Sequence, residues 1–192
     1  MSLPHAILGL LNYRAMTGYD LKRDWFDRSM RFFWPADQAQ IYRALERLVE
    51  HDWASFTVEA GGDRPNRKVY SLTADGRAEL THWLTTPAAL PTVRDPLLVQ
   101  LFCAADIADD DIARLLAATR AEHQARLDNY RRIQAQLPTL GSGKRLQLWQ
   151  LVLGNGIERE SSYLAWLDHA LASFSGDPEP NGSRPTIALT TP

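Results

Sequence analysis

The sequence lacks several features that mark common classes of protein. It contains one cysteine, Cys103, so no disulfide can form within the chain, and we expect a protein of a reducing compartment. No apolar run reaches the roughly 18 residues that a membrane-spanning helix needs, and the first residues lack the basic start of a signal peptide. The composition therefore predicts a cytoplasmic protein that does not enter a membrane.

The sequence also lacks an excess of positive charge. Its 192 residues carry a formal net charge of −2. Residues 1–84 hold 11 basic and 11 acidic side chains, and residues 85–192 hold 10 and 12. Because no region is uniformly basic, any surface that binds nucleic acid must come from local clusters of basic residues.

Signatures of catalysis and metal binding are missing as well. The five histidines have no metal-ligand spacing, and Cys103 lies in an apolar segment, where it is expected to pack as a small hydrophobic residue. Residues 141–144 resemble part of a phosphate loop, but Pro138 stands where its first glycine belongs. Residues 154–156 lack the third glycine and the strand of a dinucleotide site. We therefore expect no enzyme, no metal and no cofactor.

The first half of the chain contains the pattern of several short helices. The apolar residues 6–11 predict a buried helix, and a second helix is expected over residues 19–33. Asp37 followed by Gln40 predicts a capping box at the start of a third helix, which ends near His51. A tight turn between the second and third helices gives the outline of a helix-turn-helix.

The third helix has one apolar and one polar face. Its expected inward residues are Ile41, Leu45, Leu48 and Val49. Its expected outward residues are Ala39, Gln40, Arg43, Glu46, Arg47 and Glu50. In the major groove, glutamine suits adenine and arginine suits guanine. Gln38, Gln40 and Arg43 are therefore the candidate base-reading residues, and Arg47 is a candidate phosphate contact.

A β-hairpin with a basic tip is predicted after the third helix. Residues 55–59 and 68–72 alternate as strands do, and a turn rich in Gly, Pro and Asn joins them. The basic residues of this tip are Arg64, Arg67 and Lys68, which we expect at DNA phosphates. Tyr19 and Tyr42 are further candidates for phosphate contacts, although core packing explains Tyr42 nearly as well.

The rest of the chain is predicted to be helical. A fourth helix begins near Thr73 with Leu80, Trp83 and Leu84 as its apolar residues, and residues 85–94, with two prolines, form a linker. Helices are then expected from Pro96, with an apolar set of Leu97, Leu98, Leu101 and Phe102, and over about 109–137 and 144–174. Residues 175–192 are predicted to be a disordered tail.

Two long helices with apolar stripes have too little partner surface within one chain of this size. A homodimer would cover these stripes. Four aromatic residues of this half are candidates for an effector pocket, namely Phe102, Tyr130, Trp149 and Tyr163. Packing in a helical core is the more common role of such residues, so both interpretations stay open. Gly154 and Gly156 inside a helix indicate a kink or a close backbone approach.

Several of these stretches follow one another in an order that a known family shares. They are residues 7–11 with 18–21, residues 41–48, residues 64–76, and residues 94–98 with Trp166-Leu167. This ordered set resembles the longer branch of the PadR family of bacterial transcriptional regulators. The resemblance implies a winged helix-turn-helix DNA-binding domain over residues 1–84. It also implies a helical dimerisation and effector domain over residues 95–174, and repression that a small molecule relieves.

The chain departs from the family pattern at two positions. Arg43 stands where proline is common, which puts the sequence preference in doubt, and Asp52-Trp53 replaces a common glycine after the third helix. Asp52 is therefore expected to adopt the left-handed conformation. The leading hypothesis is a mainly α-helical, homodimeric repressor that binds double-stranded DNA at a near-palindromic operator and responds to an aromatic effector. The alternative, suggested by the neutral charge of residues 1–84, is a winged-helix protein-interaction module without DNA binding.

Overall fold

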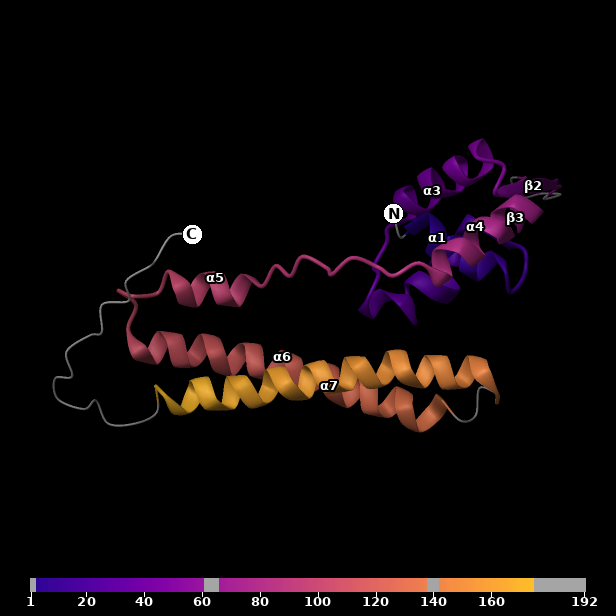
Figure 1. Cartoon of the computed structure of the whole chain (residues 1–192). Helices are drawn as coiled ribbons and strands as arrows, with labels where there is room; N and C mark the ends of the chain where they lie inside the picture. Colours follow the sequence, from indigo (N-terminus) through magenta and orange to yellow (C-terminus); the bar gives the residue numbers. More distant parts are fainter. Residues whose placement is uncertain (1–2, 61–65, 138–141, 175–192) are drawn as a thin grey trace. The chain divides into compact units, whose positions relative to one another are not determined.

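The computed structural model of the protein describes residues 3–60, 66–137 and 142–174 (Figure 1). The chain forms two compact units, Met1–Thr92 and Val93–Pro192. The predicted mainly α-helical fold with a small β-hairpin is confirmed. Arg64 and the tail 175–192 lie outside the described residues. Among the described helices, none combines the length and the apolarity that crossing a bilayer requires.

The first unit is a three-helix core with a small sheet and a closing helix. Its elements are α1 (Leu3–Leu11), β1 (Met16–Thr17), α2 (Gly18–Leu21), α3 (Gln38–Glu50), β2 (Ala54–Glu59), β3 (Arg67–Leu72) and α4 (Ala74–Thr85). The side chain of Thr73 caps α4 by accepting a hydrogen bond from the Gly76 amide at 3.0 Å. Asp52 has a φ of 58°, so the left-handed conformation expected between α3 and β2 is confirmed.

The second helix differs from its prediction. Instead of one helix over residues 19–33, α2 ends at Leu21 and continues as a π-helical turn, Lys22–Phe26, and a separate 3₁₀ turn, Met30–Phe32. Leu21 and Phe26 are both buried. Residues five apart point about 140° away from each other in a regular α-helix, whereas the wider π turn lets both face the core. The uninterrupted helix was therefore a wrong prediction.

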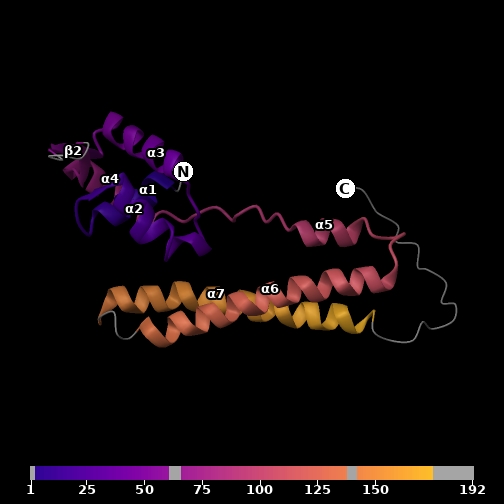
Figure 2. The same ribbon diagram turned by 180° about the vertical axis from the view of Figure 1, so that it is seen from behind.

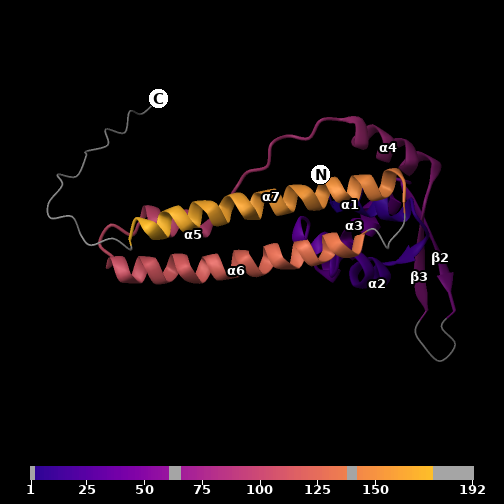
Figure 3. The same cartoon turned by 90° about the horizontal axis from the view of Figure 1, so that it is seen from below.

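The sheet has three strands where the sequence predicted two. Its order is β1-β3-β2, and all neighbours are antiparallel. Met16 of β1 pairs with Tyr70 of β3, which in turn pairs with Phe56 of β2. A strand of two residues is too short to show an alternating pattern. In Figure 3, β2 and β3 form a hairpin that extends away from the helices of this unit.

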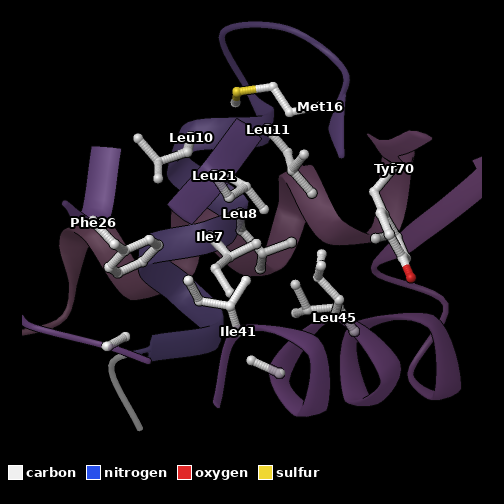
Figure 4. Packing of buried hydrophobic residues seen from close by; sticks show 14 of the residues in the cluster. Ile7, Leu8, Leu10, Leu11, Met16, Leu21, Phe26, Ile41, Leu45 and Tyr70 are labelled. Atoms are coloured by element: carbon white, nitrogen blue, oxygen red, sulfur yellow. The ribbon is translucent and has the colours of Figure 1, made fainter. Parts of the chain in front are cut away.

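The core of the first unit lies between α1, α2 and α3 (Figure 4). Its fully buried side chains include Ile7, Leu8, Leu21, Ile41, Leu45 and Leu48. Truncating one such leucine to alanine costs about 2–5 kcal/mol in unfolding free energy. Val49 is only partly buried at the edge of this core, and Leu84, one of the apolar residues expected on α4, is 66% exposed.

The second unit is an antiparallel helical hairpin with a short third helix. It comprises α5 (Pro96–Phe102), α6 (Asp109–Gln136) and α7 (Lys144–Ala172). Figures 1 and 2 show α6 and α7 side by side, each about 42 Å long at ~1.5 Å per residue. Arg120 of α6 pairs with Asp168 of α7, and His123, further along α6, pairs with Glu160, which comes earlier in α7, so the two helices run antiparallel. Leu97 packs α5 against Leu116 and Leu167 of the two long helices.

Part of the apolar surface of the second unit is exposed in the single chain. On α7 the exposed apolar residues are Leu148, Leu151 and Val152, and on α5 they are Leu98, Val99 and Phe102. Of the apolar set expected on α5, Leu97 and Leu101 lie in the core of this unit, whereas Leu98 and Phe102 are exposed in the single chain. Cys103 is exposed as well, so its expected role as a small buried residue is wrong.

Candidate nucleic-acid interface

The start of α3 is held by the predicted capping box. The Asp37 carboxylate accepts a hydrogen bond from the Gln40 backbone amide at 2.7 Å, and the Gln40 side-chain oxygen accepts one from the Asp37 amide at 2.9 Å. Without these two bonds, the backbone amides of Asp37 and Gln40 at the end of the helix would lack acceptors within the protein. The cap fixes where α3 begins and therefore which side chains stand in its first turns.

The outward face of α3 is polar and exposed, as the spacing predicted. Its exposed residues are Gln38, Ala39, Gln40, Tyr42, Arg43, Glu46, Arg47 and Glu50. The apolar residues Ile41, Leu45 and Leu48 are fully buried on the opposite side. The Gln40 side-chain oxygen already accepts a hydrogen bond in the cap, so Gln38 is the glutamine of the first turn whose whole amide group is better placed to meet another molecule.

One edge of this face borders a shallow hollow against the start of α1. The hollow is lined by Leu3, Pro4, Gln40, Arg43, Ala44 and Arg47. Arg43 and Arg47 are one helical turn apart, so their stems lie side by side. Two neighbouring guanidinium groups at the edge of an exposed helix suit either the acceptors of guanine or the phosphates of a nucleic-acid backbone.

The two candidate tyrosines lie at the junction of α2 and α3. Tyr19 is exposed, and the Arg23 guanidinium carbon lies 5.2 Å from the centre of its ring. Tyr42 is 37% exposed and packs against Gly18 so closely that a Cβ atom on Gly18 would lie 2.6 Å from its Cε1 atom. Tyr42 therefore both packs against α2 and exposes part of its side chain. The packing interpretation of Tyr42 is confirmed, and its contact with a phosphate stays a prediction.

The wing formed by β2 and β3 carries two of the three predicted basic residues in its described part. Arg67 donates from Nη2 to the Glu59 carboxylate at 3.1 Å across the hairpin. The Lys68 ammonium lies 4.4 Å from the centre of the Phe56 ring, a cation–π contact. Both cations are thus held at the surface of the hairpin rather than extended freely into solvent.

Tyr70 connects the wing to the outward face of α3. Its side chain points from β3 toward α3, with the hydroxyl group at its end (Figure 4). Burial raises the pKa of the Tyr70 phenol, and the nearby Tyr42 and Glu46 raise it further. Glu46 therefore lies close enough to the wing to affect a residue of β3.

The four candidate effector residues are spread along the second unit. Tyr163 donates a hydrogen bond to Asp95 at 2.6 Å and stacks on His123 at 4.3 Å between ring centres. Tyr130 packs against Gly156, where a Cβ atom would lie 3.1 Å from its ring, so the close approach expected at this glycine is confirmed. Phe102 is 85% exposed on α5, and Trp149 lies near the start of α7. The four candidate effector residues therefore do not lie together at one site within the single chain.

Sequence reasoning missed two residues of the wing. Glu59 is the partner of Arg67, and Phe56 supports Lys68. The signal for Glu59 was its position: in an antiparallel hairpin the residues that flank the turn face each other, and Glu59 pairs with Arg67 at the end of the ladder. Phe56 had no comparable signal, because its register opposite Tyr70 depends on the length of the turn.

Family models match both units of the chain. Residues 7–82 match the model of the transcriptional regulator PadR-like family, and residues 93–175 match the model of the virulence activator alpha C-terminal region. A probable transcriptional regulator of Mycobacterium tuberculosis is 37% identical over 181 residues, which cover 88% of this chain and 95% of that protein.

Solved structures resemble the whole fold. Bacillus subtilis PadR, a negative transcriptional regulator, is 29% identical over 180 residues, covering 91% of this chain and 98% of that protein. Its crystal structure in complex with operator DNA matches with a TM-score of 0.82, and its structure in complex with p-coumaric acid with 0.78. Each covers 91% of this chain and 99–100% of the matched one. The virulence activator AphA of Vibrio cholerae matches with a TM-score of 0.71 at 31% identity, over 90% of this chain and 97% of AphA.

Proposed function

The chain belongs to the PadR-like family of transcriptional regulators, and on that basis we propose that it is a homodimeric repressor of a near-palindromic operator. Its relatives are regulators of transcription and not enzymes, and one of them forms a complex with operator DNA. The observation that carries the proposal is the exposed polar face of a capped α3 beside a basic wing. In a helix-turn-helix protein this arrangement puts the first turns of the second helix of the motif against base edges in the major groove.

The side chains divide into base-reading and phosphate-binding groups. Gln38 and Arg43 stand on the first turns of α3, where glutamine suits adenine and arginine suits guanine. Arg47, one turn further on, binds the phosphate backbone, as do Arg67 and Lys68 of the wing. The hydroxyl groups of Tyr19 and Tyr42 provide further donors to phosphates. Gln40 fixes the start of α3 through the cap, and any contact that it makes with DNA comes from the rest of its amide group.

The proposed dimer is supported by the uncovered apolar surface of the second unit. Leu148, Leu151 and Val152 recur at i, i+3 and i+4 along α7 and are all about half exposed or more. Apolar area contributes roughly 25 cal/mol per Å² when it is removed from water, so leaving this stripe in solvent is costly. A second copy related by a twofold axis would cover it, and two α3 helices about 34–36 Å apart would then meet successive major grooves.

Repression and its relief are supported by one relative. Bacillus subtilis PadR is a negative regulator that has been crystallised with p-coumaric acid. We propose that a small aromatic acid likewise releases this chain from its operator.

Because the similar AphA is a virulence activator, the direction of regulation is tested by fusing the chain's own upstream region to a reporter gene. Repression predicts higher reporter expression when the regulator is deleted, and lower expression would contradict it.

A binding-interference experiment tests the DNA-binding geometry. The full chain is incubated with its own upstream region after partial methylation of guanine N7, which blocks contacts in the major groove. Interference at two patches one helical turn apart is the expected pattern. Interference at one patch only, or no binding, would contradict the dimeric model.

Added p-coumaric acid should release the DNA and quench tryptophan fluorescence. If no compound in a panel of aromatic acids releases the DNA, the effector part of the proposal fails.

A further inference from the structure

Glu46 is an acidic residue in the middle of the exposed face of α3, which is the proposed DNA-binding surface. Ala39, Arg43, Glu46 and Glu50 recur at i, i+4, i+7 and i+11, so they form one row along α3. This row is exposed and lies opposite the buried row of Ile41, Leu45 and Leu48. Gln38 and Tyr42 flank it on one side, and Gln40 and Arg47 on the other. Glu46 therefore stands at the centre of the surface.

The Glu46 carboxylate has no partner within the part of the chain that the structure describes. It forms no hydrogen bond there, and no ion pair with Arg43 or Arg47 although both are close to it in sequence. Its charge helps to raise the pKa of Tyr70, so it lies near β3 of the wing as well as on the exposed face of α3. An acidic group in this position repels the DNA backbone and weakens binding unless the DNA offers it a donor.

The edges of the bases in the major groove decide which donor fits. Guanine presents two acceptors and thymine one acceptor and a methyl group, so both repel or fail to bind a carboxylate. Adenine has an amino group but also the N7 acceptor beside it. Cytosine presents the N4 amino group as a donor without an adjacent acceptor on the same base. A carboxylate at the centre of the surface is therefore best matched by cytosine.

We propose that Glu46 is a specificity-determining residue that accepts a hydrogen bond from the N4 amino group of a cytosine in each operator half-site. The inference rests on the proposed placement of α3 in the major groove. Arg43, one turn before Glu46 in the same row, binds guanine nearby. The Glu46 carboxylate stabilises binding to cytosine. Its charge also weakens binding to every other base at that position and to every site where it would face a phosphate.

Selection from random DNA tests the assignment directly. The full chain selects duplexes from a library with a randomised centre, and single base-pair substitutions of the selected site are then compared in competition binding. We expect one C·G pair per half-site at which substitution weakens wild-type binding about tenfold. Glu46→Ala should reduce that penalty to less than about twofold and should bind duplexes without the site more tightly than the wild type does.

Two further variants make the test specific. Glu46→Gln should move the preference at the same pair from cytosine to adenine, because a glutamine amide matches adenine N6 and N7. Glu50→Ala removes the same charge one turn further along the row and should keep the cytosine preference. An unchanged penalty profile in Glu46→Ala would overturn the inference, as would loss of the preference in Glu50→Ala. If the wild type selects no site, or Arg43→Ala binds as well as the wild type, the proposed function itself fails.

Discussion

Arg67 and Glu59 face each other across the wing, with 3.1 Å between Nη2 of the arginine and Oε2 of the glutamate. Both side chains are at least half exposed, so the pair contributes little to folding and a phosphate can replace the carboxylate. The free protein thus holds the cation that we propose binds DNA against an internal counterion. Glu59 orients Arg67 and at the same time lowers the positive potential of the wing.

Replacing Glu59 should strengthen DNA binding. Glu59→Gln removes the carboxylate that competes with phosphate for Arg67, and we expect an increase in operator affinity of about two- to fivefold at low salt. Fluorescence anisotropy of a labelled operator duplex measures the effect, which should shrink as salt increases. Glu122→Gln, an exposed residue of α6, is the control for the change in net charge. If Glu59→Gln has the same effect in an Arg67→Ala background, the two residues are not coupled and the interpretation fails.

Two glycines of the first unit should respond to alanine in opposite directions. A Cβ atom on Gly76 would overlap the backbone carbonyl of Trp53, whereas one on Gly9 in α1 would meet nothing within 4 Å. Gly76→Ala should lower the unfolding free energy by about 3 kcal/mol, and Gly9→Ala should raise it by about 0.5–1 kcal/mol. Denaturant unfolding at one fixed protein concentration compares them. Equal effects of the two substitutions would contradict the packing described for Gly76.

The hydrogen bond between Tyr163 and Asp95 should make the stability of the second unit sensitive to alkali. Burial, followed by the bond to Asp95, raises the pKa of the Tyr163 phenol above its ordinary value near 10. The stabilisation is complete below about pH 10 and is lost as the pH rises toward the folded-state pKa, because the unfolded chain ionises first. Tyr163→Phe should cost about 1–2 kcal/mol at pH 7, and its deficit should narrow above about pH 10. A deficit that stays constant from pH 8 to pH 11 would show that Tyr163 does not titrate in this way.

Introducing a charge into the exposed stripe of α7 should separate the proposed dimer. Leu151→Asp puts a carboxylate on a surface that the partner would cover, whereas Gln150→Asp puts one on another side of the same helix. Analytical ultracentrifugation should find the wild type and Gln150→Asp at twice the 21.7 kDa chain mass and Leu151→Asp at the chain mass. Operator affinity should fall with dissociation. A wild type that sediments as a monomer at micromolar concentration would contradict the proposed homodimer.

Local chemistry predicted from the sequence agrees well with the structure where it depends on neighbouring residues. The Asp37–Gln40 cap, the start of α4 at Thr73 and the left-handed Asp52 each depend on a few adjacent residues, and all are confirmed. The polar face of α3 was also predicted correctly, because a helix of 13 residues shows its period clearly. These features define the candidate site, although its individual contacts with DNA stay predictions.

Features that depend on tertiary packing were missed or mistaken. The π turn after Leu21 places Phe26 in the core, and residues 19–33 show no pattern that indicates it. The exposure of Phe102 reflects which face of a seven-residue helix meets α6 and α7, and seven residues do not define that face. The spread of Tyr130, Trp149 and Tyr163 follows from the antiparallel pairing of two long helices, which fixes how far apart their residues lie.

The most direct measurement of the central claim, that α3 and the wing bind DNA together, is the salt dependence of operator binding. The wild type is compared with Arg43→Ala, Arg67→Ala and the double variant on one selected duplex. Arg67→Ala should reduce the slope of log affinity against log salt by about one unit, while Arg43→Ala should also weaken discrimination between base pairs. If the double variant keeps the affinity, slope and base preference of the wild type, this face of the protein does not contact DNA.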